Sequence, residues 1–284
     1  MLWKDNGRSA DLEDGRASGG GGFGGRAGLG IGGTAVLLVL SLVFGHNFFN
    51  DVGGGTQVVS QSNGRLSPAD SAREEPEVRF MSSVLDDVQD TWTKILPQFG
   101  AQYHHAKLHL FRGATDTGCG TGQTAMGPFY CPLDEKVYLD FEFYEELRTK
   151  FAASGDFAQA YVIAHELGHH VQHILGIDAK MRQAAQRDPG RQNELSVKLE
   201  LQADCFAGVW AHSTEQRRML QQGDVDEALT AAASVGDDRI QQQSRGHVNS
   251  DTFTHGSSAQ RAGWFKKGLS SGDPRACDTF ATGN

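Results

Sequence analysis

The sequence is poor in positive charge. Its 284 residues include 26 lysines and arginines against 35 aspartates and glutamates, which gives a formal net charge of −9 at pH 7. A protein whose main partner is nucleic acid places a basic patch or stripe against the phosphates. The sequence contains no such stripe. We therefore exclude nucleic acid as the main partner.

Cysteine is also scarce, and its spacing excludes one common kind of metal site. The four cysteines, Cys119, Cys131, Cys205 and Cys277, form no C-x-x-C pair, so a zinc ribbon is not expected. Four widely spaced cysteines instead favour disulfide bonds, which persist in an oxidising compartment. The alternative, four free buried thiols, would suit a cytoplasmic domain.

One stretch lacks charged side chains altogether. Residues 27–50 contain no Asp, Glu, Lys or Arg, and the stretch is just long enough to span a bilayer as a helix. Basic residues precede it and the next one is Arg65, so the positive-inside rule places the amino terminus in the cytoplasm. We predict a transmembrane anchor here, with a cleaved signal peptide or a buried core helix as the alternatives.

This span divides the chain into four parts. Residues 1–26 are polar and glycine-rich, and we predict a disordered cytoplasmic segment. Residues 27–50 are the predicted anchor. Residues 51–75, rich in polar residues and glycine, indicate a flexible linker. Residues 76–284 are then expected to form one folded domain.

The most informative motif is His165-Glu166-x-x-His169, inside an apolar run that predicts a helix from Phe157 to Leu175. Histidines at positions i and i+4 share one helical face, so both imidazoles can bind one Zn²⁺. Glu166 lies roughly 100° around the helix from His165. It can therefore serve as the general base of a hydrolase instead of binding the metal.

A zinc site on this helix needs a third protein ligand. Residues 194–210 predict a second helix, which carries Glu200 and Asp204 one turn apart. Two carboxylates one turn apart repel each other. Apolar residues lie on the same face of the helix, so we do not expect this face to be simply exposed to solvent. We assign Glu200 as the third ligand and Asp204 as the acceptor that orients one imidazole. Glu194 or Asp204 is the alternative ligand.

These segments resemble a known family, the bacterial putative neutral zinc metallopeptidases. The resemblance rests on residues 165–172 (HELGHHVQ), 200–210 (ELQADCFAGVW) and 254–261 (THGSSAQR), and residues 8–16 are also similar to the family's start. It implies an α+β, zincin-like fold, mostly helical with a small sheet. It also implies a Zn²⁺ cofactor, a protein or peptide substrate, and an N-terminal helix in the lipid bilayer.

We therefore expect a peptidase with a single span in the bacterial inner (cytoplasmic) membrane and its domain on the periplasmic side. Zn²⁺ would polarise the scissile carbonyl, and Glu166 would take a proton from the attacking water and pass it to the leaving amine. His255 is the candidate that stabilises the developing oxyanion, with Tyr138 and His247 as competitors.

Two other functions stay open at this point. One is a non-catalytic, anchored zinc protein with a structural or partner-binding role. A structural zinc site normally has a fourth protein ligand, and no fourth Cys or His lies at suitable spacing, which favours a catalytic site. The other is hydrolysis of a substrate such as cell-wall peptide, which the sequence does not distinguish from proteolysis.

The four cysteines allow three pairings. We favour Cys119–Cys131, which closes the loop between two predicted strands at residues 107–111 and 136–140, and Cys205–Cys277, which ties the C-terminal tail to the helix of Glu200. The second strand, or residues 127–132 before it, is the candidate for pairing with an extended peptide, by analogy with the zincin class.

A glycine within the first motif carries a further expectation. Gly168 inside a helix costs about 1 kcal/mol relative to alanine, so we expect another backbone or a substrate to approach it closely. Further helices are predicted from Val78 to Phe99, over residues 224–233, and after a cap at Ser257 or Ser258.

Overall fold

The computed structural model describes residues 1–17, 66–123, 127–143 and 155–281, and the fold is mostly helical with a small sheet. The α+β prediction is confirmed. In chain order the elements are β1 (Leu12–Asp14), α3 (Pro68–Ile95), β2 (Lys107–Phe111), β3 (Ala114–Thr117), β4 (Gly120–Gln123), β5 (Phe129–Cys131), β6 (Lys136–Asp140), α5 (Asp156–Ile174), α6 (Ile177–Arg187), α7 (Gln192–Gln216), α8 (Asp224–Ser234), α9 (Asp237–Arg245) and α10 (Ser258–Ser271).

The larger sheet has the strand order β1-β2-β6-β5, in which β1, β2 and β6 are parallel and β5 is antiparallel to β6. Strand β6, residues 136–140, was one candidate for pairing with a peptide, and that candidate is wrong. Its two edges are already hydrogen-bonded to β2 and β5. The other candidate, residues 127–132, contains β5, which among the described strands has a neighbour on one side only.

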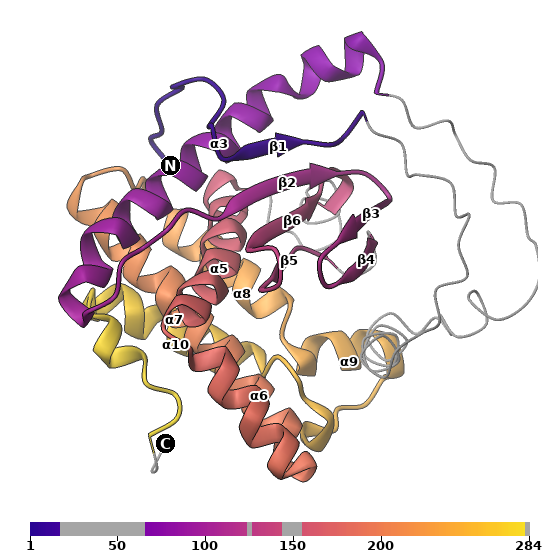
Figure 1. The fold of residues 1–284 in the computed structure, drawn as a ribbon, viewed down its shortest axis with the longest axis vertical. Helices are drawn as coiled ribbons and strands as arrows, with labels where there is room; N and C mark the ends of the chain where they lie inside the picture. The colour runs from indigo at the N-terminus through magenta and orange to yellow at the C-terminus, as the bar shows by residue number, and fades with distance from the viewer. Residues whose placement is uncertain (18–65, 124–126, 144–154, 282–284) are drawn as a thin grey trace, which may run out of the picture.

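The helices pack around α5, which contacts α3, α7 and α8. Figure 1 shows α5 beside the sheet, with α7 and α10 near it. Helices α7 and α10 approach most closely where two glycines face the opposite backbone. A Cβ at Gly208 would lie 2.1 Å from the carbonyl oxygen of Phe265, and one at Gly268 would lie 1.9 Å from that of Cys205. Neither position can accept a side chain.

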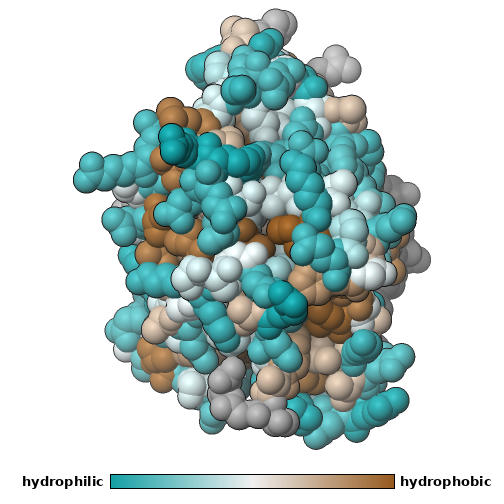
Figure 2. All heavy atoms as spheres, turned by 90° about the vertical axis from the view of Figure 1, so that its left-hand side faces the viewer, coloured by the Kyte–Doolittle hydropathy of each residue, from teal (hydrophilic) through white to brown (hydrophobic). Residues whose placement is uncertain are grey.

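Two disulfides fasten the domain, and both are the pairs favoured from the sequence. Cys119–Cys131 joins the β3–β4 hairpin to β5, and Cys205–Cys277 joins α7 to the C-terminal segment after α10. On the face shown in Figure 2, hydrophobic residues form separate patches among hydrophilic side chains. Such a mixed surface is normal for a folded domain in water.

The amino-terminal segment is part of the fold. The sequence predicts disorder over residues 1–26, but residues 1–17 include β1, which pairs with β2. The side chain of Arg16 is fully buried, and its guanidinium lies 2.8 Å from Asp14 and 2.7 Å from Glu74 of α3. A buried guanidinium needs such partners, and they fix the segment to the domain.

Helix α3 begins earlier than predicted. It starts at Pro68, inside the expected linker of residues 51–75, and the side chain of Ser67 accepts a hydrogen bond from the N–H of Asp70 as its cap. Residue 76, the expected start of the folded domain, and Val78, the expected start of this helix, both lie within α3. The predicted anchor, residues 27–50, falls outside the described residues, and its contact with a bilayer stays a prediction.

Strands β1 and β2 are hydrogen-bonded neighbours, and this pairing requires residues 1–17 and the domain to lie on the same side of any membrane. A single span between them would separate them. The pairing and the single-span orientation expected from the sequence thus exclude each other, and the orientation stays a prediction. In the described part of the chain, no helix combines the length and the apolar character needed to cross a bilayer.

We expect two single-cysteine positions, one in each part, to react alike. Leu2 and Leu133 are both exposed, at 56% and 76%, and no described native cysteine is free. In spheroplasts that express the full chain, Leu2→Cys and Leu133→Cys should both react with a membrane-impermeant maleimide, or both only after permeabilisation. Reaction of Leu133→Cys alone in intact spheroplasts would contradict the shared side.

Candidate metal centre

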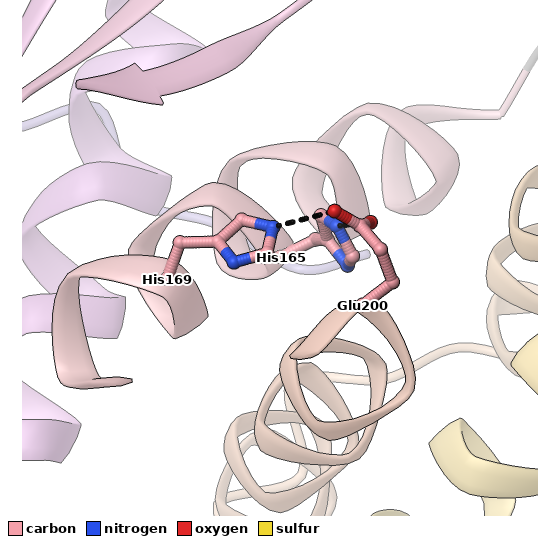
Figure 3. Close-up of side chains that lie close together, drawn as sticks. All are labelled: His165, His169 and Glu200. Atoms are coloured by element: carbon pink, nitrogen blue, oxygen red, sulfur yellow. Dashed lines mark hydrogen bonds and ion pairs between the residues drawn. The ribbon is translucent and has the colours of Figure 1, made fainter. Parts of the chain in front are cut away.

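Helices α5 and α7 bring three predicted metal ligands together. The Nε2 atom of His165 lies 3.2 Å from Oε2 of Glu200, and Nε2 of His169 lies 3.5 Å from Oε1 of the same carboxylate. One ligand atom from each residue lies within 4.8 Å of the others. Figure 3 shows both imidazoles on one helix, directed at the carboxylate on the other.

These distances fit a tetrahedral Zn²⁺ ion. With metal bonds of about 2.0–2.1 Å, neighbouring ligand atoms in a tetrahedron lie roughly 3.4 Å apart. The separations of 3.2 and 3.5 Å, which end at the two different oxygens of the Glu200 carboxylate, are both close to that value. Glu194, the alternative ligand, is paired instead with Arg191 and Lys198. The structure therefore favours Glu200 as the third ligand.

Each imidazole is oriented through its other ring nitrogen. The Nδ1 of His165 lies 2.9 Å from Oδ1 of Asp204, and the Nδ1 of His169 lies 2.9 Å from Oε1 of Gln172. In each case the Nδ1–H can donate to the oxygen, so that Nε2, which faces Glu200, is the nitrogen that can give up its proton and bind a metal. Histidines that bind metal are commonly held in this way. Asp204 thus occupies the place predicted for it.

Asp204 is itself held by two residues that the sequence reasoning missed. The Nε and Nη2 atoms of Arg261, on α10, lie 2.9 and 3.0 Å from its two oxygens, and the hydroxyl of Tyr161 donates to it. Both Asp204 and Arg261 are buried. A buried carboxylate requires a cationic or hydrogen-bond-donating partner, so the sequence could have predicted that Asp204 has one. The sequence could not identify which arginine supplies it.

Burial and charge together make the centre favourable for a cation. Burial by itself would lower the pKa of His165. The carboxylates of Asp204 and Glu200 outweigh this effect and raise the pKa to about 10. Burial raises the pKa of the Glu166 carboxyl, and within the described residues this group has no hydrogen bond or ion pair. Arg261 pairs directly with Asp204 and also interacts with the charges of Glu200 and Glu166. Three carboxylates face this one guanidinium, so a bound cation would help to balance them.

The loop that carries His255 lies against α7 beside Glu200. Asp237 accepts hydrogen bonds from the N–H groups of Thr254, His255 and Gly256, at 2.7, 2.6 and 3.0 Å, and its Oδ1 lies 3.3 Å from the Nδ1 of His255. A Cβ at Gly256 would lie 3.2 Å from Leu201. Asp237 thus shapes the loop and orients the ring, a role the sequence analysis did not assign to any residue.

The competitors of His255 lie elsewhere. The hydroxyl of Tyr138 donates to Asp134, and His247 is exposed with its Nδ1 at 3.2 Å from the carbonyl oxygen of Arg245. By contrast, the charge of Glu200 raises the pKa of His255, although burial opposes that effect. Among the three candidates, His255 is the one whose electrostatic partner is a predicted metal ligand.

Comparison with known proteins agrees with this geometry. Residues 1–280 match the profile of the family described as "Putative neutral zinc metallopeptidase". The chain belongs to this family. The resemblance drawn from the motifs is thereby confirmed, and the family's name implies dependence on zinc.

The chain is similar to two bacterial proteins, one along its full length and one along about two thirds of it. The chain is 49% identical over 286 residues to "Uncharacterized protein YpfJ" of Escherichia coli strain K12, covering 99% of each chain. It is 46% identical over 207 residues to "Uncharacterized protein Rv2575" of Mycobacterium tuberculosis strain H37Rv, covering 69% of this chain and 68% of the relative. No solved structure matches the chain.

We expect Asp204→Asn to weaken zinc binding by about 10–100-fold, because the amide removes the charge that orients His165. It should also lower the free energy of unfolding by about 3–5 kcal/mol, because it leaves the Arg261 guanidinium buried without its counter-charge. Chelator competition and urea unfolding measure the two effects.

The double variant Asp204→Asn/Arg261→Met separates these effects. It removes the unpaired charge, so stability should recover towards that of the wild type while zinc affinity stays low. Unchanged zinc affinity in Asp204→Asn would contradict the role of Asp204.

Proposed function

We propose that this protein is a zinc-dependent peptidase. The observation that carries the proposal is the convergence of His165, His169 and Glu200 beside the buried, unpaired carboxylate of Glu166. Structural zinc sites normally have four protein ligands, whereas catalytic sites have three and leave one position open. In the described part of the chain, three such groups converge here.

Zn²⁺, when bound, would polarise the substrate carbonyl and lower the pKa of water. Glu166 would take a proton from the attacking water and transfer it to the leaving amine. Burial raises the pKa of Glu166, which makes its carboxylate a stronger base. Because Glu166 has no hydrogen bond to other described residues, its carboxylate can serve both steps.

His255 would stabilise the developing oxyanion. Its Nδ1 lies 3.0 Å from the hydroxyl oxygen of Thr254 and 3.3 Å from Oδ1 of Asp237, so an Nδ1–H would donate there and the ring would present Nε2 to its other side. Burial lowers the pKa of His255, but Asp237 and Glu200 raise it further, which favours the protonated ring. A protonated ring can donate from Nε2 to an oxyanion while its Nδ1–H keeps the bond to Asp237.

The substrate would be an extended protein or peptide chain bound at the edge of β5. The hydroxyl of Tyr130 in β5 donates to Nδ1 of His170 in α5 at 2.9 Å, and Nε2 of His170 lies 2.7 Å from the carbonyl oxygen of His104. These bonds hold the edge strand against the helix of the metal ligands. An antiparallel edge strand beside that helix supports a zincin-like arrangement and substrate binding by strand addition.

The domain would function outside the cytoplasm. Its two disulfides, Cys119–Cys131 and Cys205–Cys277, support this location because such bonds persist in oxidising compartments. Because β1 is paired with β2, residues 1–17 would lie there as well. The maleimide experiment at Leu2 and Leu133 reports this side directly.

We expect Glu166→Gln to keep zinc and lose cleavage. Glutamine is close in shape but cannot accept the proton, so cleavage of an unstructured protein should fall by about 10²–10⁴-fold with zinc content unchanged. If wild type and variant both hold zinc and neither cleaves, the non-catalytic zinc protein is the better reading. If the wild type holds no zinc, the ligand set is wrong.

We expect His255→Gln to lower kcat by about 10²–10³-fold while changing KM little, since the lost donor acts on the transition state. Asp237→Asn should lower kcat less, and His255→Gln/Asp237→Asn no further than His255→Gln alone. His247→Gln is the matched control and should retain full activity. Full activity in His255→Gln would contradict the assignment.

A further inference from the structure

The two metal-binding histidines are oriented by different kinds of acceptor. The carboxylate of Asp204 orients His165, whereas a neutral amide, Gln172, orients His169. Gln172 and its neighbour Gln202 are both buried, at 1% and 4% exposure. Buried side-chain amides of this kind require a complete set of hydrogen-bond partners.

Hydrogen bonds lead from His169 through both amides to the backbone near the C-terminus. Oε1 of Gln172 accepts from His169 at 2.9 Å, and its Nε2 donates to the carbonyl of Leu199 at 2.8 Å and to Oε1 of Gln202 at 3.1 Å. Nε2 of Gln202 donates to the carbonyl of Cys277 at 3.0 Å. This set of contacts is called the glutamine chain below.

The direction of the glutamine chain is fixed at its ends. The carbonyl oxygens of Leu199 and Cys277 can only accept, so the NH₂ groups of both glutamines must face them. The amide oxygen of Gln202 then faces Gln172, and that of Gln172 faces His169. An amide oxygen can only accept, so Nδ1 of His169 must carry the proton. The chain therefore leaves Nε2 of His169 free to bind a metal.

The far end of the chain is held covalently. Cys277 is bonded to Cys205 of α7, which lies one residue beyond Asp204. Gln202 also lines a cavity of about 360 Å³, together with Trp92, Phe206, Arg275 and Asp278. Its amide is buried, so loss of its hydrogen bonds would be costly.

We propose that Gln172 and Gln202 are positioning residues that fix the metal-binding tautomer of His169 through the carbonyl of Cys277. The proposal rests on the proposed function, because it requires that His169 binds zinc. It assigns Gln202, which does not touch His169, a measurable effect on the metal.

Zinc affinity in the full-length Glu166→Gln protein, measured by chelator competition, tests this without any need for turnover. Gln172→Met should weaken zinc binding by about 10–100-fold. Gln202→Met should weaken it less. The double variant should bind zinc as Gln172→Met does, because Gln202 acts only through Gln172. Unchanged affinity in Gln202→Met, or losses that multiply in the double variant, would overturn the proposal.

Gln172→Glu separates positioning from packing. Its carboxylate can still accept from His169 without help from Gln202, so zinc affinity should be largely restored, and adding Gln202→Met should then have little effect. If Gln172→Glu binds zinc as weakly as Gln172→Met, Gln172 does not act as an acceptor and the proposal is wrong. This comparison also decides the matter if Gln202→Met alone does not fold.

Gln89→Met is the matched control. Gln89 is a fully buried glutamine of α3 that accepts a hydrogen bond from the N–H of Ala106 at 2.8 Å, and among the described residues no hydrogen bond joins it to His165, His169 or Glu200. It should lower the urea midpoint and leave zinc affinity unchanged. If the Glu166→Gln parent itself binds no zinc, the proposed function fails. If the parent binds zinc and the glutamine variants match it, only the glutamine chain fails.

Discussion

The centre depends on how closely α5 and α7 approach each other. A Cβ at Gly168 of α5 would lie 3.1 Å from the carbonyl oxygen of Ala203 in α7, tighter than an ordinary contact. Glycine at this position therefore allows the two helices to pack closely, and the imidazoles of α5 can then reach the Glu200 carboxylate of α7. The expectation that Gly168 faces another backbone is confirmed. A larger residue would push Glu200 away from both imidazoles.

The two histidines near this contact differ in the groups behind them: charged side chains hold His165, and neutral amides hold His169. On one side, Arg261 of α10 balances Asp204, so a full ion pair lies behind His165. On the other, amide dipoles lie behind His169. Both arrangements depend on segments that follow α7 in the chain, and the disulfide of Cys277 and the glycine contact between α7 and α10 hold those segments in place.

Local patterns predicted the parts of the structure that are local. Periodicity gave the metal helix within one residue at each end, and alternation gave β2 and β6 with their observed bounds. Spacing predicted His165 and His169, and it favoured Glu200 as third ligand with Glu194 and Asp204 as alternatives. Arg261, Asp237 and β1 were not predicted, because each acts through a partner far away in the chain. Gly155 occupies the N-cap position before α5 and has no side chain to cap the helix.

The pairing of β1 with β2 also constrains how the protein acquires its structure. Leu12 pairs with Leu108, so the first strand to be synthesised cannot complete the sheet until its partner strand has emerged. Closing so long a loop costs conformational entropy, and this cost is offset only by long-range contacts that form late in folding. Until then, the outer edge of β2 offers free backbone groups that can pair with other chains. Folding of this protein thus includes a period of exposure that ends when its own amino-terminal strand pairs with β2.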